Sequence, residues 1–123
     1  MVKNNSDKFL TGFTVSVDYK YGTTTGVSFF DRVKTIKAIV DKKSLPSDFT
    51  RPGHVLPLRG HPQGLKSRQG HTEASLHLMK LADLTEAAVI CEILNKGGKS
   101  SNRKESHDFA KKYNFSFLQI EDL

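Results

Sequence analysis

Apolar and polar residues alternate from residue 11 to residue 18, and this alternation predicts a strand with one buried face. In this stretch (TGFTVSVD), Phe13, Val15 and Val17 fall on one side, and polar residues fall on the other. The next stretch, 19–26, is rich in glycine and threonine and predicts a loop.

A different spacing follows and predicts a helix over residues 28–42. Val33, Ile36 and Val40 fall on one helical face. The first residue of this segment is a serine, and Asp31 follows three positions later. This spacing resembles a capping arrangement at a helix start.

The second half of the chain alternates segments of the two kinds. The expected elements are a short strand at 55–58, a helix from Thr72, a strand at 87–94, a helix at 103–113 and a closing strand at 115–120. The segment 87–94 (AAVICEIL) is almost continuously apolar, which is typical of a strand covered on both faces. Strands alternating with helices indicate a layered α/β architecture, and the length fits a single domain, 1–123.

Composition narrows the class of protein. Hydrophobic residues make up 37% of the chain and charged residues 26%, which argues against disorder and against a coiled coil. No apolar run is long enough to span a membrane, and the first ten residues (MVKNNSDKFL) do not have the apolar stretch typical of a signal peptide. The single cysteine, Cys91, excludes an internal disulfide framework and a cysteine-cluster zinc site. We therefore expect a soluble, cytoplasmic protein with no membrane partner.

The formal net charge is +6, from 19 basic and 13 acidic residues. Acidic and polar residues interrupt the basic ones, and aromatic residues are not interleaved with them as in a base-stacking surface. We therefore expect no nucleic-acid partner. The charge is compatible with a solvated basic face or with the attraction of a small anion.

Three places in the sequence hold residues that could do chemistry. In the first (RPGH, 51–54), a proline-containing turn precedes His54 at the start of a predicted strand. Histidine titrates near neutral pH, so His54 could act as a general acid or base. The alternative is a surface histidine that is hydrogen-bonded within the turn.

The second place is a basic loop that runs into a predicted helix start (RQGHTE, 68–73). Backbone N–H groups at a helix start, the Thr72 hydroxyl and the Arg68 guanidinium suit a phosphate. His71 could donate to a substrate or bind a metal. The alternative is that Thr72 only caps the helix.

The third place is Glu92, an acid within the apolar run 87–94. A buried carboxylate is costly, and loss of water would raise its pKa towards a useful range. The side chain could equally point outwards from the end of the strand. Taken together, the three places indicate a pocket with a phosphate clamp, two histidines and a carboxylate, which suits the enolisation of a sugar phosphate.

Several blocks of the sequence resemble the 3,4-dihydroxy-2-butanone 4-phosphate synthase family of riboflavin biosynthesis. The blocks are TGFTVSVD, TTTGVSFFDRVKTI, DFTRPGHVLPLR, GLKSRQGHTEAS, AAVICEI and IEDL. They extend from about residue 10 to the last residue. The resemblance implies a layered α/β sandwich with a mixed sheet, truncated at its N-terminus.

The resemblance also implies a reaction and its partners. Members of this family are lyases that convert ribulose 5-phosphate to 3,4-dihydroxy-2-butanone 4-phosphate and formate. They use Mg2+ (or Mn2+) and act as homodimers, so we expect a homodimer or higher oligomer.

Site residues follow from the same resemblance. His54 and Glu92 match the family's catalytic residues, and His71 matches a metal ligand. The implied substrate-binding residues are Arg68, Gln69, Gly70, His71, Thr72 and Glu92.

The sequence also departs from the family pattern. Family members have an N-terminal acidic loop (R-E-N-E) that supplies a carboxylate ligand for magnesium, and residues 1–10 contain no such motif. The family usually has a small residue where Gln69 stands, and residues 97–102 (GGKSSN) replace another family stretch. We therefore expect the carboxylate ligand to be missing from this chain.

Three functions remain open at this point. The chain could retain synthase activity, with another polypeptide supplying the acidic loop. It could be a catalytically incomplete relative that binds a sugar phosphate or pairs with a chain carrying that loop. It could also use the retained histidines and glutamate for a different lyase or isomerase reaction.

Overall fold

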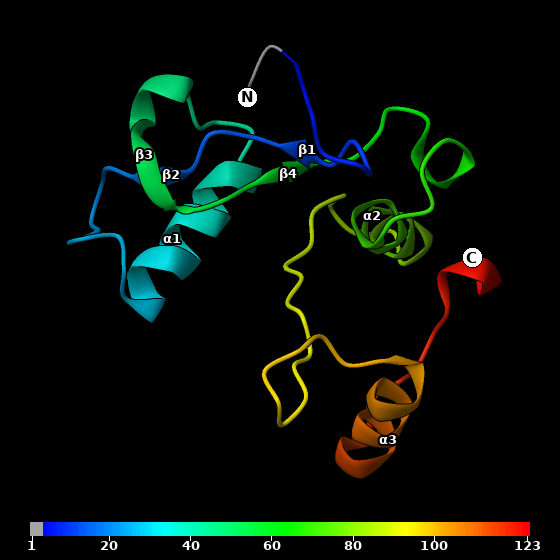
Figure 1. Cartoon of the computed structure of the whole chain (residues 1–123). Helices are drawn as coiled ribbons and strands as arrows, with labels where there is room; N and C mark the ends of the chain where they lie inside the picture. The colour runs from blue at the N-terminus through cyan, green and yellow to red at the C-terminus, as the bar shows by residue number, and fades with distance from the viewer. Residues whose placement is uncertain (1–3) are drawn as a thin grey trace. The chain divides into compact units, whose positions relative to one another are not determined.

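The structure is a computed structural model that describes residues 4–123. The chain divides into two compact units, which we call unit 1 (Met1–Pro62) and unit 2 (Gln63–Leu123). The helices and strands of each unit are labelled in Figure 1. That the whole chain forms one domain stays a prediction.

Unit 1 contains two small antiparallel sheets. Their strands are β1 (Gly12–Phe13) paired with β4 (Leu58–Arg59), and β2 (Val17–Tyr19) paired with β3 (Phe49–Val55). A short 3-10 turn, η1 (Pro46–Asp48), leads into β3. The pairings within the described residues are antiparallel, and the parallel pairs that a mixed sheet requires are not among them.

The predicted strand at 11–18 is broken in the middle. Phe13 pairs with Leu58 and Val17 pairs with Val55. The three residues 14–16 therefore lie opposite only two residues, 56 and 57. This mismatch interrupts the hydrogen-bond ladder, as an extra residue does in a bulge. Pro57 adds to the break because it has no N–H to donate. The predicted strand at 55–58 is divided at the same place.

The predicted helix of unit 1 is confirmed as α1 (Phe29–Val40). The side chain of Ser28 accepts a hydrogen bond from the backbone N–H of Asp31 at 3.1 Å, which caps the helix start. Thr35 lies fully buried on the inner face of α1, and its hydroxyl accepts from the Tyr19 N–H at 3.0 Å. Helix and strand β2 are therefore joined by a hydrogen bond as well as by packing.

The Asp31 carboxylate organises the loop that precedes α1. It accepts hydrogen bonds from the Thr24 N–H at 3.1 Å, the Thr24 hydroxyl at 2.8 Å and the Gly26 N–H at 3.1 Å. The pKa of Asp31 lies below its ordinary value, and the hydrogen bond from the Thr24 hydroxyl contributes most to this lowering. Burial acts in the opposite direction, while the N–H groups of Thr24 and Gly26 and the side chain of Ser28 lower the pKa further. The folded loop therefore favours the ionised carboxylate.

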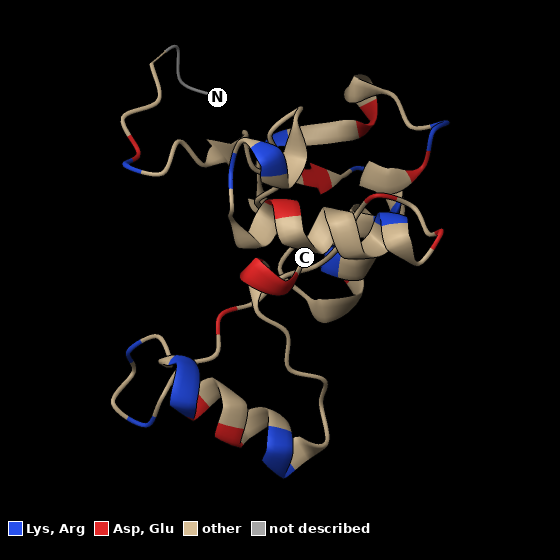
Figure 2. Cartoon of the chain, turned by 90° about the vertical axis from the view of Figure 1, so that its right-hand side faces the viewer, with Lys and Arg blue, Asp and Glu red and all other residues tan. Residues whose placement is uncertain are grey.

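Unit 2 contains two helices and two 3-10 turns. They are η2 (Gly64–Lys66), α2 (His71–Leu81), α3 (Arg103–Tyr113) and η3 (Ile120–Asp122). The helix predicted at 103–113 is confirmed, and a reciprocal pair of hydrogen bonds between Asn102 and Glu105 caps its start. Both signs of charge lie along α3 (Figure 2).

The two strands predicted in unit 2 are wrong. Residues 87–94 are not a strand and form only one isolated bridge, between Leu94 and Ser100. Residues 115–120 are irregular until η3 begins. A strand needs a neighbouring strand for its N–H and C=O groups, and an apolar run does not specify that neighbour.

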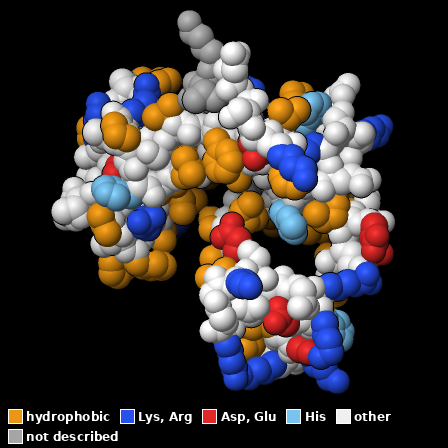
Figure 3. Space-filling model, in the orientation of Figure 1, with side chains coloured by type: hydrophobic (Ala, Val, Ile, Leu, Met, Phe, Trp, Pro, Cys, Tyr) orange, Lys and Arg blue, Asp and Glu red, His pale blue; other side chains and the backbone are white. Residues whose placement is uncertain are grey.

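Many large apolar side chains of the described residues are exposed. Phe29 and Phe30 of α1 are 72% and 79% exposed, and Val89 of unit 2 is 73% exposed. Hydrophobic side chains are correspondingly visible on the surface in Figure 3. Such surfaces are typical of faces that another protein surface covers. Within residues 4–123, no helix is both long and apolar enough to cross a membrane.

We predict that Asp31→Asn destabilises the protein at neutral pH and weakens the acid dependence of its stability. A carboxylate with a lowered folded-state pKa stabilises the fold above its unfolded pKa of about 3.9. This contribution is lost as the pH falls from there through the folded-state value. Urea unfolding between pH 2.5 and pH 7 measures both effects.

The exposed Asp41, whose carboxylate accepts one local hydrogen bond from the Lys43 N–H, provides the matched control variant Asp41→Asn. We expect its stability curve to follow that of the wild type. Parallel curves for wild type and Asp31→Asn would contradict the role of this carboxylate.

Candidate active site

His54 lies on β3, where the strand comes unusually close to β2. A Cβ atom on Gly53 would lie 2.1 Å from the carbonyl carbon of Val17, so no residue with a side chain fits at that position. The Gly53 N–H donates to the Ser16 hydroxyl at 3.2 Å across the same gap. The glycine of the RPGH sequence thus allows the approach that positions His54.

Asp18 of β2 contacts His54 through both carboxylate oxygens. Oδ1 accepts from the His54 backbone N–H at 2.9 Å, and Oδ2 lies 2.7 Å from the ring atom Nδ1. The Asp18 side chain is 13% exposed, whereas the His54 side chain is 43% exposed. A buried carboxylate therefore holds a histidine that solvent and small molecules can reach.

The surroundings of Asp18 favour its charged form. Burial by itself raises the pKa of Asp18, but the backbone and ring contacts of His54 and the charge of Arg32 outweigh burial and lower this pKa below its ordinary value. Gly26 has a positive φ of 83°, and a Cβ there would lie 2.2 Å from Oδ2. The loop before α1 therefore closes tightly over the carboxylate.

Arg32 of α1 fixes the backbone of the same histidine. Its Nη1 donates to the His54 carbonyl at 2.9 Å, and its Nε donates to the Val27 carbonyl at 2.9 Å. The sequence-based interpretation left Arg32 and Asp18 out of the site. The only local signal for Asp18 is its place at the end of an alternating strand, and this place does not identify a partner 36 residues away.

The second predicted group lies at the start of α2. Gly70 is the N-cap and His71 the first helical residue, so the suggestion that Thr72 caps the helix is wrong. Thr72 is buried within the first turn, and its carbonyl accepts from the Ser75 hydroxyl at 2.8 Å. Gly70 has no side chain, so no N-cap side chain accepts a hydrogen bond from the backbone N–H groups of the first turn.

An ion pair holds Arg68 at this helix start. Its Nη1 lies 2.5 Å from Oε2 of Glu73, whose residue exposure is only 2%. The Arg68 side chain is 20% exposed. Sequence reasoning missed the role of Glu73, which lies in the first turn of α2, five residues after Arg68. The pair fixes a cation beside the uncapped turn, as a phosphate site requires.

Glu92 differs from its predicted surroundings. It is exposed, in the irregular segment between α2 and α3, so the expected water-poor carboxylate is not found. The reason is the missing strand at 87–94, because without sheet pairing this segment is not covered on either face. The open alternative, a Glu92 side chain directed outwards, agrees with this exposure.

The predicted site residues are thus divided between the two units. His54 belongs to unit 1, and Arg68, Gln69, Gly70, His71, Thr72 and Glu92 belong to unit 2. Gln69 and His71 are exposed. The convergence of both groups on one cavity stays a prediction.

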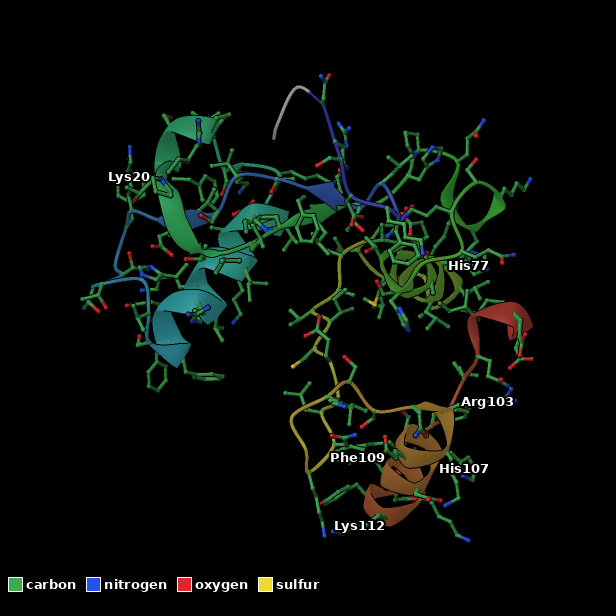
Figure 4. The ribbon with its side chains drawn as sticks, viewed as in Figure 1. Lys20, His77, Arg103, His107, Phe109 and Lys112 are labelled. Carbon is green, nitrogen blue, oxygen red and sulfur yellow. The ribbon has the colours of Figure 1, made fainter. Side chains whose placement is uncertain are left out.

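Two open hollows lie elsewhere on the described surface. One, of about 460 Å³, is lined by Lys20, Pro46, Ser47, Phe49, Thr50 and Arg51. The other, of about 490 Å³, is lined by Arg103, Lys104, His107, Phe117 and Gln119. Figure 4 labels Lys20 in the first and Arg103 and His107 in the second. Neither includes a predicted site residue.

The described residues do not fit a metal site by themselves. In residues 4–123, no three histidine, cysteine, aspartate or glutamate side chains are grouped so that they could hold an ion. Mg2+ prefers oxygen ligands in octahedral geometry, which His71 alone does not provide.

Comparison with known proteins assigns the chain to a family. The family model described as 3,4-dihydroxy-2-butanone 4-phosphate synthase matches residues 1–123. A protein of that name from Wigglesworthia glossinidia brevipalpis is 50% identical over 123 residues, which are 100% of this chain and 58% of the relative. The chain therefore spans less than two thirds of the length of the curated relatives it matches.

Solved structures support the same family assignment. A two-domain 3,4-dihydroxy-2-butanone 4-phosphate synthase from A. baumannii has a TM-score of 0.90 and 37% identity, covering 99% of this chain and 36% of that one. A synthase solved with two magnesium ions has a TM-score of 0.85 and 34% identity, covering 99% of this chain and 62% of that one. The α/β fold class predicted from the sequence is thereby confirmed. The chain belongs to the 3,4-dihydroxy-2-butanone 4-phosphate synthase family.

Proposed function

We propose that this chain forms part of the active site of a 3,4-dihydroxy-2-butanone 4-phosphate synthase. The reaction would convert ribulose 5-phosphate to 3,4-dihydroxy-2-butanone 4-phosphate and formate, as a lyase step of riboflavin biosynthesis. The observation that carries this proposal is the match of the whole chain to the family, with about 50% identity to relatives named for that activity.

The proposed chemistry begins with removal of a proton from a carbon beside the substrate carbonyl. His54 suits this step because its side chain is partly exposed and its backbone and ring are both fixed by Asp18. Glu92 is proposed as the second proton carrier and substrate contact. Its exposure leaves the carboxylate accessible to a substrate.

The start of α2 is proposed as the substrate-binding region, comprising Arg68, Gln69, Gly70, His71 and Thr72. The uncapped first turn and the guanidinium of Arg68 both favour a phosphate group. Glu73 would keep the guanidinium oriented before the substrate arrives. A guanidinium has five N–H donors, so Arg68 can contact a phosphate while it stays paired with Glu73.

His71 is proposed as the metal ligand that this chain contributes. Because the described residues do not complete a magnesium site, the remaining ligands would be oxygens of water, substrate or another polypeptide. When bound, Mg2+ or Mn2+ would supply Lewis-acid polarisation of substrate oxygens. The proton transfers proposed above use residues of the chain only.

We expect a formate-release assay with ribulose 5-phosphate and Mg2+ to detect turnover. The chain is assayed alone and with a polypeptide corresponding to the remainder of a longer relative. Glu92→Gln should reduce turnover by about 10²-fold or more, as loss of a proton-transfer group does, with an unchanged circular dichroism spectrum. Glu86→Gln, also exposed and six residues earlier, is the matched control and should retain turnover.

Absence of formate with and without the added polypeptide would refute the synthase function. A thermal shift with ribulose 5-phosphate then tests the catalytically incomplete relative. Ligand at 100 times its dissociation constant should stabilise the fold by about 2.7 kcal/mol. An unchanged melting curve would exclude a retained sugar-phosphate site.

We predict that His71→Ala weakens Mn2+ binding at least tenfold (roughly the loss expected when a metal site is disturbed). Electron paramagnetic resonance titration with Mn2+ measures free ion directly and does not depend on turnover. His77→Ala is the matched control, because His77 is a histidine of the same helix that is not assigned to the site (Figure 4). Equal affinities for wild type and His71→Ala would refute the ligand role.

A homodimer or higher oligomer in the cytoplasm is also part of this proposal. The exposed apolar side chains Phe29, Phe30 and Val89 support association, because burial of such side chains is favourable. The exposed free thiol of Cys91 is compatible with a reducing compartment. Sedimentation equilibrium at micromolar concentration should give at least twice the chain mass, and a monomer throughout would exclude the oligomer.

A further inference from the structure

We propose that Asp18 is a positioning residue that holds His54 in the tautomer whose Nε2 is free to accept a proton. This role rests on the proposed function, in which His54 removes a proton from the sugar phosphate. Neither the family match nor the sequence motifs assign a role to Asp18.

The two hydrogen bonds of the carboxylate determine the tautomer. Oδ1 accepts from the His54 backbone N–H at 2.9 Å, and Oδ2 lies 2.7 Å from Nδ1. An ionised carboxylate has only acceptor atoms, so the neutral ring must carry its hydrogen on Nδ1 to make this contact. Nε2 then retains its lone pair and can act as a base.

Ionisation of Asp18 follows from its surroundings. The contacts with His54 and the positive charge of Arg32 together lower the pKa of Asp18, against the opposing effect of burial. The carboxylate is therefore charged at neutral pH. It stabilises the imidazolium that forms when Nε2 accepts a proton, because the opposite charge lies in direct contact with the ring.

The remaining contacts fix the backbone around His54 and the position of the Asp18 carboxylate. Arg32 donates to the His54 carbonyl at 2.9 Å, and Ser16 accepts from the Gly53 N–H at 3.2 Å. Gly26 approaches the carboxylate so closely that a Cβ there would overlap Oδ2. Backbone and carboxylate are thus both fixed, which leaves the Asp18–Nδ1 contact as the feature that selects the tautomer.

The variant Asp18→Asn makes this inference testable because it should reverse the tautomer. The His54 backbone N–H can only donate, so the new amide must direct its oxygen towards it. The amide NH2 group then faces Nδ1 as a donor, and Nδ1 must accept. The ring hydrogen moves to Nε2, and the base is lost although the side chains keep their size.

Two-dimensional 1H–15N spectra of the histidine ring, recorded at a pH where the imidazole is neutral, report the tautomer without any need for turnover. We expect a protonated Nδ1 and an unprotonated Nε2 in the wild type, and the reverse in Asp18→Asn. Asp18→Ala should give a mixture, because it removes the contact without offering a donor. Ser16→Ala is the matched control: it removes the neighbouring hydrogen bond between Gly53 of β3 and the residue just before β2, and it should keep the wild-type tautomer.

A wild-type ring protonated on Nε2 would overturn the assignment. So would the same tautomer in wild type and Asp18→Asn, provided that circular dichroism shows both to be folded. If Asp18→Asn does not fold, the comparison of wild type, Asp18→Ala and Ser16→Ala decides, and a wild-type tautomer in Asp18→Ala overturns the inference.

Kinetic measurements distinguish a failure of the Asp18 positioning role from a failure of the proposed function. In the formate assay, Asp18→Asn should lower kcat by about 10²-fold or more and change KM less than about threefold. An equal loss of kcat in Ser16→Ala would indicate a structural role only and overturn the inference. If the wild type forms no formate, the proposed function fails, and the ring spectra still decide whether Asp18 sets the tautomer.

Discussion

The hydrogen bonds between the Asp18 carboxylate and His54 are the interaction on which the organisation of unit 1 depends. They join β2 to β3 at the point where Gly53 allows the two strands to approach most closely. Arg32 of α1 attaches to the same histidine through its carbonyl. Strand, helix and loop therefore meet at one buried carboxylate. Because the ring itself stays partly exposed, the arrangement combines a fixed backbone with an accessible imidazole.

Unit 2 presents a second carboxylate-supported group, organised on a helix. Glu73 is almost completely buried and holds Arg68 beside the start of α2, where glycine leaves the first turn without a side-chain cap. The two groups divide the proposed chemistry: one suits proton transfer, the other suits anion binding. In both, the residue proposed to contact the substrate is held by an acidic side chain, Asp18 in one group and Glu73 in the other. Such supporting contacts decide how accurately a reactive side chain is placed.

The sequence predicted best the features that depend on neighbours along the chain. The serine at residue 28 caps α1, as its spacing to Asp31 predicted, because helix caps use residues three positions apart. The helix expected at 103–113 is also found there. The motifs RPGH (51–54) and RQGHTE (68–73) singled out His54, Arg68 and His71 as candidates, and their roles stay predictions. Asp18 could not be found, because its partner lies 36 residues away and only the pairing of β2 with β3 brings them together. The apolar run at 87–94 was misassigned because hydrophobicity does not specify a strand neighbour.

The folded chain keeps Asp18 ionised by hydrogen bonds and charge that outweigh its burial. Burial alone would raise the pKa of this carboxyl, whereas His54 and Arg32 lower it. The most direct measurement is the titration of the Asp18 side-chain carboxyl by 13C NMR in the intact, folded chain. We expect a midpoint below that of an ordinary aspartate, about 3.9. A midpoint at or above that value would contradict this expectation.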